Sequence, residues 1–145
     1  MDAVQKAVML FQEGYSCSQA VLAAYADRFG LDEPTALKLA AGFGGGMGQL
    51  GETCGALSGA MMVLGLRYGT ADAANKTAKN QTYRIMRDLA AEFKLRAGSM
   101  TCRDLLGFDM GTEDGQLAAR RPGAFHDCPD YVRVAAEIVA EMLDR

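Results

Sequence analysis

The stretch Gly42–Tyr68, GFGGGMGQLGETCGALSGAMMVLGLRY, decides the fold of this chain. Its first half is rich in glycine, which disfavours a regular helix or strand. From Cys54 onward no charged residue precedes Arg67, and a helix without a polar face is normally buried on all sides. Thr53 is a suitable N-cap and Gly69 a suitable C-cap. The stretch therefore predicts a central helix over Cys54–Tyr68 that is the most buried helix of the protein.

Two features of this helix suggest a reactive site. Gly51, Gly55 and Gly59 recur every four residues, a spacing that forms a stripe against which another helix can pack closely. Cys54 falls at the first helical position, where free amide hydrogens and the helix dipole favour a thiolate. Burial would have the opposite effect and raise the pKa of the thiol. Because the adjoining glycine loop can supply hydrogen-bond donors, we predict that Cys54 is the most acidic thiol.

Length and composition predict a soluble protein with one domain, residues 1–145. Half of the residues are apolar and 23% are charged, which is ordinary for a globular domain. A net charge of −3 provides no basic footprint for nucleic acid. The longest uncharged apolar run is too short to span a bilayer, and the N-terminus lacks the features of a signal peptide. We therefore expect a cytoplasmic protein, in which cysteines are reactive or bind metal more often than they form structural disulfides.

Helical periodicity runs through most of the chain, and no segment alternates like a strand. Capping residues, glycines and prolines set the expected limits of the helices. The expected helical segments are 3–12, 17–29, 33–41, 54–68, 72–96, 102–106 and 128–143, with a loop over 107–123 that contains one helical turn at 116–119. This pattern predicts an all-α, single-domain helical bundle around a buried, Gly/Ala-rich central helix.

The four cysteines, Cys17, Cys54, Cys102 and Cys128, share one kind of position. Each directly follows a Ser, Thr or Asp that can cap a helix, and each precedes apolar residues of its own helix by three or four positions. Residues with that spacing share a helix face, so all four thiols are expected to point inward at the start of a helix. We predict that they meet at one end of the bundle. The alternative is that they are small hydrophobic residues buried for packing.

These segments resemble a family of redox-active proteins named for its cysteine pattern, C_GCAxxG_C_C. The resemblance covers most of the chain: GYSCSQAVL around Cys17, GGGMGQLGETCGALSGAMMVLGLRYG around Cys54, TCRDLLG at Cys102 and DCPDYVRVAAEIV at Cys128. In this chain Cys54 precedes Gly55, whereas the family name places glycine before cysteine. The resemblance implies an all-helical domain whose four cysteines form a redox or metal-cluster site. A similar domain occurs in split-Soret cytochromes, but this chain has no CxxCH motif for haem.

The cysteine pattern is compatible with three functions. In the first, the four cysteines bind an iron–sulfur cluster that passes electrons to a redox partner protein. In the second, Cys54 is the attacking thiolate of a thiol–disulfide enzyme or sensor, and Cys17 is a candidate resolving cysteine. In the third, the thiols hold a structural zinc ion or are merely buried in an interaction module. A second copy of the chain is a further candidate partner.

The glycine run matches GxGxxG, but a helical pattern precedes it, whereas a dinucleotide fingerprint follows a strand. Its glycines, Gly45, Gly46, Gly48 and Gly51, are instead predicted to wrap tightly near Cys54 and to donate amide hydrogens to bound sulfur or an anion. Met47 is a candidate soft ligand beside the cysteine site. His126, two residues before Cys128, is interpreted as a loop residue, with ligation or proton donation as the alternative.

Overall fold

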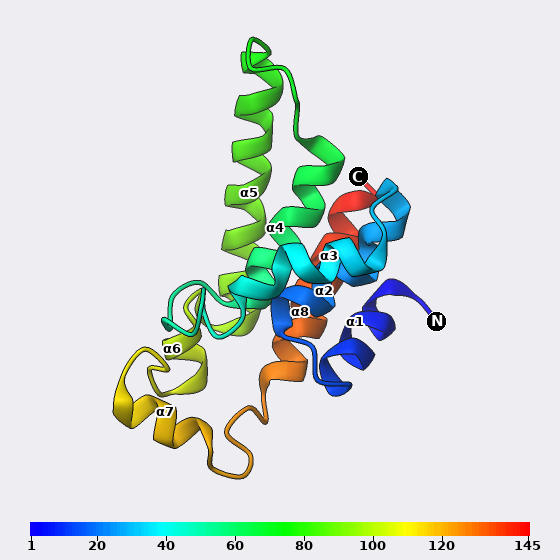
Figure 1. Ribbon diagram of the computed structural model, residues 1–145. Coiled ribbons are helices and arrows are strands. Elements are labelled where there is room, and N and C mark those ends of the chain that lie inside the picture. Colours follow the sequence, from blue (N-terminus) through cyan, green and yellow to red (C-terminus); the bar gives the residue numbers. More distant parts are fainter.

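The computed structural model describes all 145 residues and consists of helices joined by turns (Figure 1). No β-strand is present, and an isolated bridge pairs Thr53 with Thr101. The prediction of an all-α protein is therefore confirmed. The elements are α1 (Ala3–Gln12), α2 (Cys17–Tyr25), η1 (Ala26–Phe29), α3 (Glu33–Ala40), η2 (Ala41–Phe43), α4 (Gly55–Tyr68), α5 (Lys76–Ala97), α6 (Cys102–Leu106), α7 (Glu113–Ala119) and α8 (Cys128–Leu143).

Helices α2 and α4 pack directly against each other at the centre of the molecule. A Cβ atom placed on Gly59 would lie 2.7 Å from the Ser18 carbonyl oxygen, and one on Gly55 would lie 3.1 Å from the Ser18 amide nitrogen. Only glycine allows this approach, so the predicted close packing along the stripe is confirmed for these two positions. Gly51 precedes the helix and packs against the Asp109 side chain instead.

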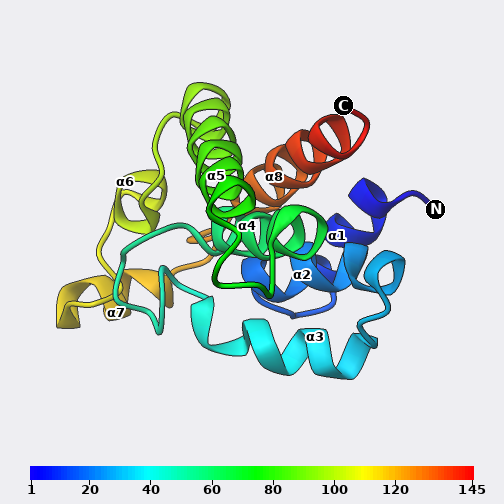
Figure 2. The ribbon, with the colours of Figure 1, turned by 90° about the horizontal axis from the view of Figure 1, so that it is seen from above.

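The prediction that α4 is the most buried helix is wrong, because α2 is more completely enclosed. Seven of the nine residues of α2 are buried, compared with eight of the 14 in α4. Figure 2 shows why: α2 lies between α3, α4 and α1, whereas the far end of α4 extends beyond the other helices together with the first turns of α5 (Figure 1). The missing polar face of α4 reflects burial on all sides only over Gly55–Ala60; beyond it, Val63 and Leu64 alone are buried.

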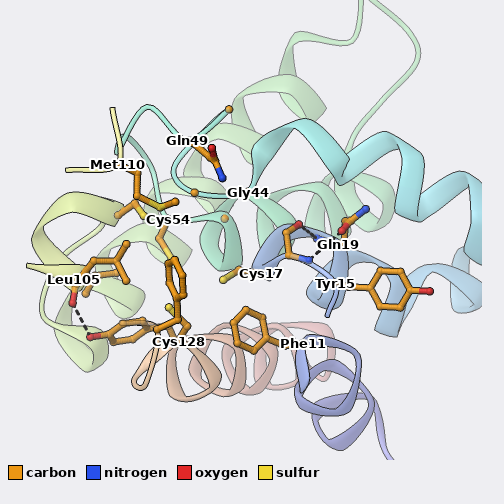
Figure 3. Close-up of a pocket in the computed structure, with 18 of the residues that line it drawn as sticks. Phe11, Tyr15, Cys17, Gln19, Gly44, Gln49, Cys54, Leu105, Met110 and Cys128 are labelled. Carbon is orange, nitrogen blue, oxygen red and sulfur yellow. Dashed lines mark hydrogen bonds between the residues drawn. The ribbon is translucent and has the colours of Figure 1, made fainter. Parts of the chain in front are cut away.

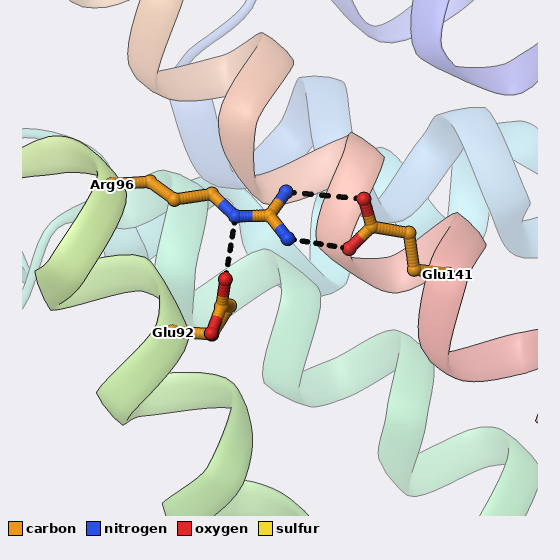
Figure 4. A network of polar contacts seen from close by, with 3 residues as sticks. All are labelled: Glu92, Arg96 and Glu141. Carbon is orange, nitrogen blue, oxygen red and sulfur yellow. Dashed lines mark hydrogen bonds and ion pairs between the residues drawn. The ribbon is translucent and has the colours of Figure 1, made fainter.

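Helix α8 closes the core on the side of α2 and α4 away from α3. The buried Tyr25 hydroxyl donates a 2.7 Å hydrogen bond to the Ala136 carbonyl of α8. Tyr68, at the end of α4, donates a 3.0 Å bond to the Met142 carbonyl. On the outer surface, Arg96 of α5 forms two hydrogen bonds to Glu141 of α8 and one to Glu92 (Figure 4). These hydrogen bonds connect α8 to α2, α4 and α5.

Three predicted boundaries shift for local reasons. Thr53 is held extended by its bridge to Thr101, so Cys54 takes the N-cap position and α4 begins at Gly55. The Asp72 side chain accepts from the Ala74 amide in a turn, which delays α5 until Lys76. Thr112 caps a complete short helix, α7, within the predicted loop by accepting from the Gly115 amide.

None of the helices combines the length and the apolar character that crossing a bilayer demands.

Candidate functional site

All four cysteines line one cavity of about 830 Å³. Cys17, Cys102 and Cys128 are the first residues of α2, α6 and α8, and Cys54 is the N-cap of α4. Figure 3 shows Cys17, Cys54 and Cys128 around the middle of the cavity, with Leu105 and Phe11 on opposite sides. The predicted placement of the four cysteines at helix starts and their meeting at one place are therefore both found in the structure.

The cysteines meet because α2, α4, α6 and α8 all begin near the same cavity. An alternating bundle places consecutive helix starts at opposite ends, but α3 separates α2 from α4, and α5 separates α4 from α6. Helix α7 and the turn after it bring the chain back before α8 (Figure 1). Each helix that begins at a cysteine thus comes two helices after the previous one, so the four helix starts lie at the same end of the bundle.

A short backbone clip holds Cys54 beside Cys102. The Cys54 amide donates to the Met100 carbonyl at 2.8 Å, and the Cys102 amide donates to the Glu52 carbonyl at 2.6 Å. These bonds flank the Thr53–Thr101 bridge and join the segments that precede α4 and α6. The clip fixes two thiols from distant parts of the sequence at one edge of the cavity.

Close helix packing positions the other two thiols. A Cβ atom on Gly55 would lie 3.3 Å from the Cys17 Cβ atom, so the first turn of α4 contacts the first turn of α2. At the start of α8, the Tyr131 hydroxyl donates a 3.2 Å bond to the Leu105 carbonyl of α6 (Figure 3). Both Cys17 and Cys128 line the same cavity.

The Cys17 and Cys128 thiols shift each other's pKa in opposite directions. A hydrogen bond from Cys17 lowers the pKa of Cys128, while the same interaction, followed by burial, raises the pKa of Cys17 well above its ordinary value. The negative charge of a thiolate is thus favoured on Cys128 and disfavoured on Cys17. The pair has the form of a thiolate that accepts a hydrogen bond from a neighbouring thiol.

The prediction that Cys54 is the most acidic thiol is wrong. Burial raises the pKa of Cys54 to about 11, and the amides of Ala56 and Leu57 only partly oppose this effect. Burial likewise raises the pKa of Cys102 to about 12, with the charges of Cys54 and Cys128 adding to it. Desolvation outweighs the helix N-terminus here, and the lowered pKa belongs to Cys128.

The glycine run forms a left-handed turn at the cavity wall. All five residues from Gly45 to Gln49 have positive φ angles between 61° and 77°, including the non-glycine residues Met47 and Gln49. Of the glycines predicted to bind a cofactor, Gly45 and Gly48 line the cavity. Gly46 and Gly51 do not line it. Gly46 lies so close to Cys102 that a Cβ atom would be 2.6 Å from the Cys102 Cβ atom.

Free hydrogen-bond donors accompany this turn. Gly44 and Gly45 line the cavity, and their backbone amides donate no hydrogen bond to the rest of the backbone. The side-chain amide of Gln49 makes no hydrogen bond either, and Figure 3 shows it directed toward Gly44. A ligand with acceptor atoms can therefore be held at this wall without displacing an internal bond.

The cavity wall contains no Asp, Glu, Lys, Arg or His side chain. Met110 and Phe125 contribute to it from segments that carry no motif, and Tyr131 contributes from the segment DCPDYVRVAAEIV, in which the sequence pointed only to Cys128. Met47 is 42% exposed and lies outside the lining, as does the exposed His126, so neither candidate ligand is part of this wall. No three His, Cys, Asp or Glu side chains are gathered closely enough to hold a single metal ion.

Comparisons with known proteins agree with this site. Residues 15–142 match the family described as "Putative redox-active protein (C_GCAxxG_C_C)", and the matched range includes all four cysteines. No curated protein and no solved structure matches the chain. Because the match spans nearly the whole sequence, the chain belongs to this C_GCAxxG_C_C family.

Proposed function

We propose that the four cysteines hold an iron–sulfur cluster as a redox centre that exchanges electrons with a partner protein. The observation that supports this most strongly is that four sulfur donors surround one cavity whose wall has no charged side chain. Thiolates are the usual ligands of such clusters. When bound, the cluster supplies one-electron chemistry that thiols alone do not provide.

The donor set fits such a group electrostatically. The charges of Cys54, Cys128 and Cys102 all raise the pKa of Cys17, so four thiolates would repel one another in this buried site. A positively charged metal centre would reverse that repulsion and favour loss of the thiol protons. Cys17, Cys54, Cys102 and Cys128 would be the ligands, and the free amides of Gly44 and Gly45 would donate hydrogen bonds to sulfur.

A cluster suits this geometry better than one structural zinc ion. A tetrahedral zinc site requires its ligands within about 2.3 Å of one ion, and no three candidate side chains are gathered in that way. The four thiols instead line a larger cavity of about 830 Å³ together with 17 other residues. A centre with several metal atoms bridges such separations more readily than a single ion does.

Anaerobic purification with iron and sulfide analysis and a visible spectrum tests this proposal. We expect bound iron and sulfide, a broad visible band that bleaches on reduction, and loss of both in the Cys54→Ser and Cys102→Ser variants. Met110→Leu is the matched control, because it alters a buried soft side chain of the same cavity and should keep the iron. Protein reconstituted with iron and sulfide that still shows neither would contradict the proposal.

The Cys17–Cys128 pair supports a second candidate function, thiol–disulfide exchange. A thiol with a lowered pKa beside a second thiol is the arrangement from which a disulfide forms and opens. This version keeps the expected thiol chemistry but assigns the thiolate to Cys128 instead of Cys54. Mild oxidation of cluster-free protein should then remove two hydrogens from the wild type and from Cys102→Ser, but not from Cys128→Ser. Mass spectrometry of cysteine-containing peptides decides this.

A further inference from the structure

The cavity has room for more than four sulfur atoms. Its volume of about 830 Å³ lies within the usual range of small-molecule sites, about 300–1,000 Å³. Twelve of its 21 lining residues are hydrophobic. We propose that this cavity, in its cluster-free dithiol form, binds an uncharged, planar ring molecule of the quinone class, which serves as a small-molecule redox partner; this inference rests on the thiol–disulfide function proposed for Cys17 and Cys128.

The side chains that line the cavity favour a ligand with a flat ring. Four aromatic side chains, Phe11, Tyr15, Phe125 and Tyr131, line the cavity together with Leu105. Phe125 is also held edge-to-face by Phe108, with ring centroids 6.3 Å apart. Flat aromatic surfaces favour offset or edge-to-face contact with another ring. Figure 3 shows Phe11 and Leu105 on opposite sides of the cavity, with other aromatic side chains that line it between them.

The wall also selects against charge. No acidic, basic or imidazole side chain lines the cavity, so an ion that enters it gives up hydration and finds no side chain of opposite charge. Hydrogen-bond donors on this wall that have no partner within the protein nevertheless favour a ligand with acceptor atoms. Gly44 and Gly45 offer backbone N–H groups, and Gln49 offers a side-chain N–H₂ group, none of which has an internal partner. A quinone combines an uncharged ring with two carbonyl oxygens that accept such bonds.

The electron balance can be met within the site. Reduction of a quinone to its hydroquinone takes up two electrons and two protons. In the dithiol form of the site, the S–H bonds of Cys17 and Cys128 break and one S–S bond forms, which releases two electrons and two protons. No further reactant is needed for one turnover.

Calorimetric titration with duroquinone tests the binding separately from the redox step. The ring of duroquinone is fully methylated, so thiols cannot add to an open ring position. The Cys17→Ser/Cys128→Ser double variant cannot form the dithiol pair and therefore reports binding alone. We expect saturable binding at one site, weakened about fivefold to tenfold by Phe125→Ala through loss of a ring contact. Tyr83→Ala, which removes an exposed tyrosine of α5, is the matched control and should leave binding unchanged.

The tetramethylbenzoate anion, which has the same ring but a negative charge, should bind at least about tenfold more weakly because the wall offers it no counter-ion. Absence of saturable duroquinone binding, equal binding of the anion, or no effect of Phe125→Ala each overturns the inference. If duroquinone binds but neither iron nor a disulfide is ever found, the proposed redox function fails and the ring site stands. If iron or a disulfide is found without duroquinone binding, only the ring site fails.

Discussion

At the residue scale, the three buried cysteines differ more in their partners than in their exposure. Cys54, Cys102 and Cys128 are 5%, 8% and 6% exposed. Their pKa values nevertheless move in opposite directions, because only Cys128 accepts a hydrogen bond from another thiol. Desolvation decides the chemistry of the others. Reactivity at this site therefore depends on the Cys17–Cys128 contact.

This contact predicts which thiol is alkylated first. In cluster-free protein near neutral pH, Cys128 should react faster with iodoacetamide than Cys54 or Cys102, because a larger fraction of it is thiolate. Cys17→Ala removes the donor and should slow alkylation of Cys128, whereas Cys17→Ser keeps a hydroxyl donor and should preserve it. Pulsed alkylation across a pH series, read by peptide mass spectrometry, measures these rates. Faster labelling of Cys54 than of Cys128 would contradict the pairing.

Tyr25 provides a second prediction at this scale. Its fully buried hydroxyl donates to the Ala136 carbonyl, and burial raises its pKa to about 12. Tyr25→Phe should lower the free energy of unfolding by about 1 kcal/mol through loss of one buried hydrogen bond. Tyr83→Phe, at an exposed position of α5, is the control and should have little effect. Equal denaturation midpoints for Tyr25→Phe and the wild type would show that the bond contributes nothing.

At the scale of elements, the α2–α4 contact carries the site. The glycines of α4 bring the first turns of the two helices together, and these are the turns that hold Cys17 and Cys54. The backbone clip before α4 and α6 adds Cys102. The packing of α2 against α4, with the backbone bonds beside it, therefore also determines where three of the four thiols lie.

Two glycines of α4 allow a matched test. Gly59→Ala places a methyl group 2.7 Å from the Ser18 carbonyl oxygen, so we expect a loss of stability of about 1–3 kcal/mol. At Gly65, in the same helix, a Cβ atom would meet nothing within 4 Å, so Gly65→Ala should stabilise by about 0.5–1 kcal/mol through helix propensity. Urea denaturation measures both. The same sign of change for the two variants would exclude close packing as the reason for Gly59.

At the scale of the whole molecule, stability should depend on alkaline pH. The pKa values of Cys54, Cys102 and Tyr25 are raised by burial to about 11, about 12 and about 12. A raised pKa means that the folded state holds the proton more tightly, so this stability is complete below the ordinary pKa and is lost as the pH rises toward the folded value.

We therefore expect the unfolding free energy of cluster-free protein to decrease from about pH 9, with the loss from Cys54 complete near pH 11. Cys54→Ser should make the first part of this decrease shallower, because it removes one of the titrating groups. Chemical denaturation at a series of pH values provides the measurement. Stability that stays constant over this range in the wild type would refute the burial argument.

The sequence by itself determined the helical class, most helix limits and the position of every cysteine at a helix start. These features depend on local information: periodicity, capping residues such as Ser16 and Asp32, and stop signals such as Gly98. They are set by residues within one or two helical turns of one another, so they can be predicted from the amino-acid sequence alone.

Only the tertiary structure decided how buried each helix is, which thiol is acidic and what else lines the cavity. Thr53 lost its cap role to a bridge with Thr101, which lies 48 residues away in the chain. Cys128 gained its lowered pKa from Cys17, and Met110 and Phe125 reached the cavity from segments without a motif. Desolvation and contact between distant residues depend on how the helices pack, and the order of residues along the chain does not state that packing.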